Sequence, residues 1–130
     1  MPITVRWYDE TQHIMIWDIA TKWTIEEFYQ ALDTTRSLAD TTTEPVNVIV
    51  DAQAVIERPN TNLLPHFRHA LSSIDLQSVV YLRTKISGSS VLIEMLVGAV
   101  LRMAPHLTVK DFKFAKTVPE ALSYIKTAQR

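Results

Sequence analysis

Hydrophobic and polar positions along the first part of the chain predict two strands and then a helix. Residues 3–8 (ITVRWY) and 13–19 (HIMIWDI) are short runs rich in β-branched and aromatic residues, and the polar DETQ separates them. Such a pair is typical of a hairpin. From 24–27 (TIEE), which has the form of a capping box, the apolar positions change to helical spacing. We therefore expect two antiparallel strands and an amphipathic helix over 24–39.

The middle of the chain alternates strand and helix. The compact apolar run at 46–52 (VNVIVDA) is typical of a strand buried on both faces. Apolar residues at helical spacing over 63–74 predict a helix, in which Pro65 is tolerated because it falls in the first turn. The run SVVYLRT at 78–84 predicts the next strand.

The last third predicts helix, strand and helix. A nearly uniform apolar stretch at 91–103 predicts a helix, and a strand near 108–115 carries lysines suited to a sheet edge. A second capping-box sequence, TVPE at 117–120, starts the final helix. The order β-β-α-β-α-β-α-β-α predicts one α/β domain over 1–130, with a mixed sheet that begins as an antiparallel hairpin and continues with parallel strands.

Composition and length exclude several classes of protein. The 13 basic and 14 acidic residues give a net charge of −1, without the basic excess of a nucleic-acid-binding protein. The chain has no cysteine, which excludes disulfides and thiolate metal sites. The charged start, with Arg6 and Asp9, differs from a signal peptide, so we expect a cytoplasmic protein. The apolar stretch at 91–103 is broken by Glu94 and Arg102 and falls short of the ~20 residues that span a bilayer.

The order of elements resembles the sulfate-transporter and anti-sigma-factor-antagonist (STAS) domain family, in particular its small SpoIIAA-like members. The likeness includes the opening hairpin, the strand ending at Asp51, and FKFAKTVPEALSYI at 112–125. It implies a non-enzymatic module that binds a protein or a small ligand, some relatives being linked to apolar or lipid-like ligands. In anti-sigma antagonists of the family a switch serine follows this aspartate; DAQAV at 51–55 keeps the aspartate and lacks the serine.

Ligands of open α/β sheets gather beyond the carboxyl ends of the parallel strands. In this chain that rule selects the segments after the third and fourth strands. Free backbone N–H groups at the start of the helix predicted at 91–103 favour an anion there. Residues 83–90 lack the Walker pattern, however, and helix capping is the simpler explanation for their serines. The candidate binding residues at this edge are Asp51, Gln53, Thr84, Lys85, Ser87, Ser89 and Ser90.

A phosphoacceptor is a further hypothesis for the same edge. Asp51, Thr84 and Lys116 end successive strands, similar to the site of response-regulator receivers. Those domains hold Mg²⁺ with an additional acidic pair, whereas the acids near the first strands here fall in the hairpin turn or, like Asp18, stand alone. The simpler role for Asp51 is to order the loop that follows it.

Histidines and tryptophans supply two other candidates. His66 and His69 share a helix face and could reach one metal, but the spacing supplies no third ligand, so we expect surface histidines and no metal or cofactor.

Trp7 and Trp17 have the parity of a core-facing sheet surface, whereas Trp23, just before the helix cap, is the candidate for the rim of a ligand site.

The helix predicted at 91–103 carries more apolar surface than one sheet face needs. We expect the excess to form a homodimer contact, with Met95, Leu101 and Met103 as candidates. The functional prediction is a regulatory module that acts through protein–protein interaction, without catalysis. The alternative is a protein that binds a small apolar, lipid-like or anionic ligand.

Overall fold

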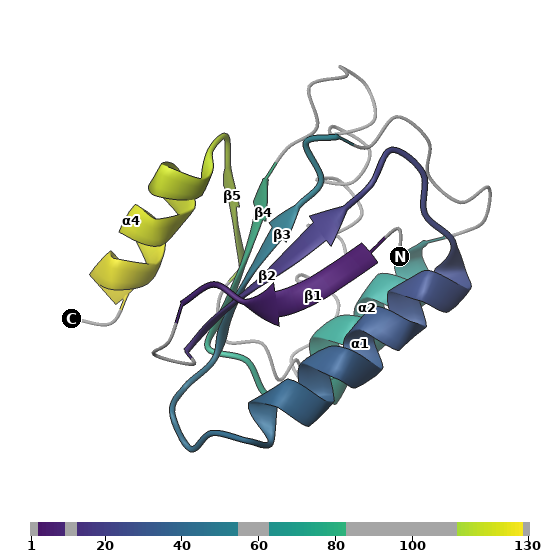
Figure 1. Ribbon diagram of the computed structural model, residues 1–130, viewed down its shortest axis with the longest axis horizontal. Helices are drawn as coiled ribbons and strands as arrows, with labels where there is room; N and C mark the ends of the chain where they lie inside the picture. The colour runs from purple at the N-terminus through teal and green to yellow at the C-terminus, as the bar shows by residue number, and fades with distance from the viewer. Residues whose placement is uncertain (1–2, 10–12, 55–62, 83–111, 129–130) are drawn as a thin grey trace.

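The described part of the chain folds into a five-stranded sheet with helices on both faces (Figure 1). The computed structural model describes residues 3–9, 13–54, 63–82 and 112–128. The α/β class predicted from the sequence is confirmed. The strands are β1 (Ile3–Trp7), β2 (Ile14–Ile19), β3 (Asn47–Asp51), β4 (Ser78–Leu82) and β5 (Phe112–Ala115), and the described helices are α1 (Ile25–Ala39), α2 (Leu64–Ser73) and α4 (Val118–Ala128).

The sheet topology is also as predicted. The strand order is β1-β2-β3-β4-β5, in which β1 pairs antiparallel with β2 and every later pair is parallel. The last strand lies at an edge and carries the exposed Lys113, as expected for a strand that must avoid pairing with other chains. The parallel strands therefore end at one common edge of the sheet, which we call the carboxyl edge.

Helices α1 and α2 lie side by side on one face of the sheet, and α4 covers the other face (Figure 1). The sheet divides the core into two parts, because successive side chains of each strand point to opposite faces. Met15 and Trp17 of β2 pack in the core beneath α1 and α2, together with partly buried Trp7 of β1, so the parity prediction for these tryptophans is confirmed. The second core, beneath α4, comprises Ile14, Ile16, Ile49, Val80, Leu82, Ala115, Ala121 and Ile125.

Both predicted capping boxes mark helix starts, with different partners. At α1, the Thr24 hydroxyl accepts from Glu27 N at 3.2 Å and the Glu27 carboxylate accepts from Thr24 N at 2.9 Å. At α4, the Thr117 hydroxyl accepts from Glu120 N at 3.2 Å, but the Glu120 carboxylate reaches one residue further back and accepts from Lys116 N at 3.1 Å. Local sequence therefore determines where both helices begin.

Several predicted segments lie wholly or partly outside the described residues. These are the helix at 91–103, the start of the strand at 108–115 and the end of the strand at 78–84. Among the described helices, none is long and apolar enough to cross a membrane.

Candidate functional site

An open depression lies at the carboxyl edge, beside the ends of β2 and β3. Its volume is about 460 Å³. It contains Asp51 and Gln53, two of the residues that the sequence selected for this edge. Its described lining residues are Thr4, Asp18, Ile19, Ala20, Asp51, Gln53 and Ala54.

Two carboxylates in the depression come from neighbouring strands. Asp18 of β2 and Asp51 of β3 are register partners. Each follows by two positions a residue of the core beneath α4, Ile16 and Ile49 respectively, so both carboxylates belong to that face of the sheet. Asp18 is not among the residues predicted for this edge, because the sequence analysis did not assign β2 as the neighbour of β3. That assignment would have identified Asp18 as the partner of Asp51.

Asp51 orders the loop that begins at the end of β3. Its Oδ1 accepts a hydrogen bond from the backbone N–H of Gln53 at 3.1 Å, the arrangement of an Asx turn. This is the loop-ordering role expected from the sequence. The bond holds the backbone of Gln53 at the depression and leaves the neighbouring Ala54 exposed to solvent.

Asp18 has a cationic neighbour on β1. Arg6 Nε lies 3.4 Å from Asp18 Oδ2, and the two side chains are 53% and 45% exposed. An ion pair this exposed contributes little to stability because solvent screens it. Among the described residues that line the depression, Asp18 and Asp51 carry the charge, and Arg6 pairs with the first of them.

Trp23 lies in the core and not on a surface rim. Its side chain is 7% exposed, and its ring centroid is 5.8 Å from that of Phe28. Both residues belong to the core beneath α1 and α2. Little of the indole therefore remains for a ligand to contact.

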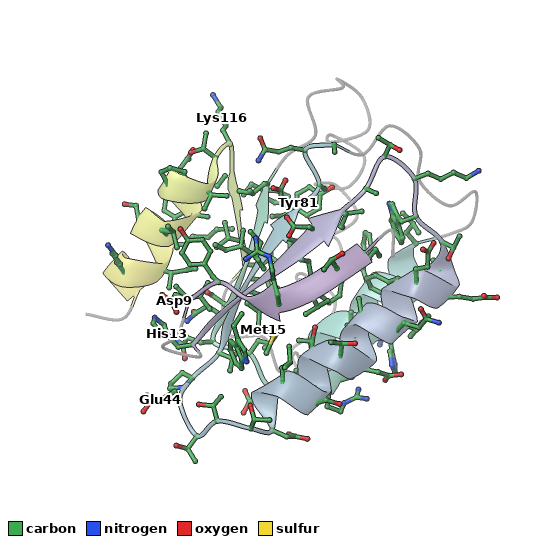
Figure 2. The ribbon with its side chains drawn as sticks, in the orientation of Figure 1. Asp9, His13, Met15, Glu44, Tyr81 and Lys116 are labelled. Atoms are coloured by element: carbon green, nitrogen blue, oxygen red, sulfur yellow. The ribbon has the colours of Figure 1, made fainter. Side chains whose placement is uncertain are left out.

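Other candidates are separated from the depression or lie outside the described residues. Lys116 follows β5, two strands from β3, and its exposed side chain points away from the sheet (Figure 2). Two sets of candidates lie outside the described residues. They are the carboxyl-edge candidates Thr84, Lys85, Ser87, Ser89 and Ser90 and the dimer-interface candidates Met95, Leu101 and Met103.

The histidine pair has a partner that the sequence did not reveal. Tyr29 of α1 places its hydroxyl 2.7 Å from Nδ1 of His66, and its ring contacts both His66 and His69. His66 is therefore a half-buried residue in contact with α1, while His69 remains exposed. Within the described ranges, no three or more His, Asp or Glu side chains gather into a metal site.

A second cavity, of about 560 Å³, lies at the opposite end of the strands. It is formed where the chain leaves α1 and α2 and enters β3 and β4, and its lining includes Arg36, Asp40, Glu44 and Asp75. Glu44 and Lys116 project at opposite ends of the molecule (Figure 2). The two cavities are thus separated by the length of the strands.

Comparisons with protein-family models, curated proteins and solved structures found no match. The strand order and pairing agree with the α/β fold expected from the resemblance to STAS domains, and membership of that family stays a prediction.

Proposed function

We propose that this chain is a STAS-like module that acts by binding a protein partner at the carboxyl edge, without catalysis. The observation that carries the proposal is the open depression in which Asp18 and Asp51 lie on adjacent strands and Asp51 holds the backbone of Gln53. Ligands of parallel sheets bind at this edge. These two partly exposed aspartates favour a partner with basic side chains.

Two other features agree with this proposal. The described lining of the depression includes no basic side chain, so the charge that it presents comes from Asp18 and Asp51. The cysteine-free sequence also suits a reducing compartment, and we propose a cytoplasmic setting. The small-ligand alternative loses its aromatic contact because Trp23 is 7% exposed.

A phosphoacceptor role at Asp51 is a second candidate. The register partner Asp18 favours it, since Mg²⁺ beside a phosphoryl group requires more than one carboxylate. Against it, Asp51 Oδ1 already accepts a hydrogen bond from Gln53 N. We therefore rank it below protein binding.

Site-specific photo-crosslinking tests the proposed surface. A photoreactive amino acid at Ala54, exposed at the depression, should capture a partner protein in cells; the same group at Glu44, exposed near the other cavity, is the matched control. We expect an adduct at least ~10-fold stronger at Ala54, and a loss of that adduct when Asp18→Lys reverses a charge at the edge. Equal adducts at both positions, or none at Ala54, would contradict the proposal.

We further propose that the chain forms a homodimer through the helix predicted at 91–103. This part of the proposal rests on the sequence, because Met95, Leu101 and Met103 lie outside the described residues. Sedimentation velocity should give twice the chain mass of 14.8 kDa. Leu101→Glu should return the monomer by placing a charge in an apolar contact, whereas Glu94→Gln, at a position that already interrupts the apolar stretch, should leave the dimer intact. A wild-type monomer at high concentration would refute the homodimer.

A further inference from the structure

Side chains from α1 and α2 form a cluster in which two imidazoles contact one phenol. The Tyr29 ring centroid lies 5.5 Å from that of His66 and 5.6 Å from that of His69. Tyr29 and His66 are half-buried, and His69 is exposed. We call these three residues the Tyr-His cluster. It belongs to the helix layer and is distinct from the carboxyl-edge depression, whose described lining contains none of them.

The positions of the two histidines suit a chelate. They are three residues apart on α2, so their side chains lie on the same face of the helix. Contact with the same Tyr29 ring keeps both imidazoles on the α1 side of that face. Two imidazoles on the same helix face can bind one ion. The second metal–nitrogen bond then loses less entropy on forming than a bond to a separate imidazole molecule would.

The hydrogen bond to Tyr29 suits His66 as a ligand in one of the two tautomers of its ring. Tyr29 Oη and His66 Nδ1 are 2.7 Å apart. In the tautomer that carries its proton on Nδ1, His66 donates to the phenol oxygen, and the lone pair on Nε2 is left to bind a metal. A histidine ligand usually donates its other ring N–H to a carboxylate, a backbone carbonyl or water, and such a bond fixes both its tautomer and its ring orientation; for His66 the phenol oxygen takes the place of that acceptor.

We propose that His66 and His69 bind a divalent transition-metal ion of the zinc, nickel and copper class, with Tyr29 as the positioning residue for His66. Imidazole is a preferred ligand for these ions, and the chain has no cysteine thiolate to compete. Within the described residues no third His, Asp or Glu joins them, so the proposal assigns two protein ligands from this part of the chain. The site does not depend on the proposed function at the carboxyl edge.

Calorimetric titration of the full chain with Zn²⁺ in a non-coordinating buffer tests the site. We expect one ion per chain, and a loss of affinity of at least ~10-fold for both His66→Gln and His69→Gln. Tyr29→Phe keeps the ring contacts but removes the hydroxyl, and should weaken binding by ~10-fold. His106→Gln removes a histidine elsewhere in the sequence and should leave the affinity unchanged.

A measurement on the wild-type chain keeps the test independent of how the variants fold. Histidine ring-nitrogen NMR spectra should show Zn²⁺-induced shifts at Nε2 of His66 and at the ring of His69, while the Nδ1 proton of His66 is retained by the bond to Tyr29. Shifts confined to other histidines would overturn the proposal. So would a calorimetric affinity that His106→Gln reduces as much as His69→Gln does.

Discussion

At the scale of single residues, buried polar side chains connect elements that are distant in the sequence. Asn47 is 0% exposed; its Nδ2 donates to the carbonyl oxygen of His13 at 3.1 Å, and its Oδ1 accepts from Ser78 Oγ at 2.6 Å. These bonds join the amino ends of β2, β3 and β4. Because an unpaired buried polar group is costly, Asn47 and Ser78 disfavour any other register between these strands.

A second buried pair links the hairpin to α1. The indole Nε1 of Trp17 donates to Thr35 Oγ1 at 2.9 Å, and the same hydroxyl donates to the Ala31 carbonyl at 2.8 Å. Thr35 is 0% exposed. The hydroxyl therefore serves as both donor and acceptor in a position where water cannot replace it.

Thr35→Val tests this link. The substitution keeps the side-chain shape and leaves the Trp17 N–H buried without its acceptor, so the free energy of unfolding should fall by about 1–3 kcal/mol. Thr34→Val is the control, because Thr34 makes the equivalent bond to the Gln30 carbonyl but is exposed. It should change stability by no more than about 0.5 kcal/mol. Urea unfolding of both variants measures this difference, and equal losses would contradict the role given to Thr35.

At the scale of elements, the helices begin in different ways. Thr24 and Glu27 satisfy each other's backbone donors at the start of α1. At the start of α2, Leu63 makes no side-chain capping bond but is 1% exposed, and Pro65 lies in the first turn. Polar capping thus positions α1, whereas burial of an apolar anchor positions α2.

Removing the α1 cap should have a modest and local effect. Thr24→Ala should lower the free energy of unfolding by about 1 kcal/mol, since the N–H of Glu27 loses its acceptor. Thr43→Ala, at an exposed position in the loop after α1, is the matched control and should stay within about 0.5 kcal/mol of wild type. Thermal and urea denaturation provide the measurement. A control loss as large as that of Thr24→Ala would argue against the capping assignment.

At the scale of the whole molecule, the arrangement of strands determines which side chains meet. The pairing of β2 with β3 brings Asp18 beside Asp51, and the packing of α1 beside α2 brings Tyr29 to the histidines. The two candidate sites therefore come from different layers of the fold, the sheet edge and the helix layer, and a change at one should leave the other intact.

For the described residues, the sequence predicted the order of the elements, the antiparallel first pair and the edge position of the last strand. These features follow from local signals, namely hydrophobic periodicity and the capping sequences at 24–27 and 117–120. The partners of Asp18 and His66 could not be predicted in that way, because each lies on another element whose position depends on tertiary packing. Trp23 illustrates the same limit: its place before a cap suggested a rim, and packing against Phe28 buries it.

Parallel pairing of β2 and β3 brings Asp18 and Asp51 together at one edge, and a pair of introduced cysteines can detect this in the cysteine-free chain. Adjacent strands are about 4.8 Å apart, within the range that a disulfide accepts. Under mild oxidation, the folded variant carrying Asp18→Cys and Asp51→Cys should form an intramolecular disulfide, detected by intact mass. The variant carrying Asp18→Cys and Glu44→Cys should stay reduced. The absence of a disulfide in the first variant, or equal oxidation of both variants, would contradict the parallel pairing of β2 with β3.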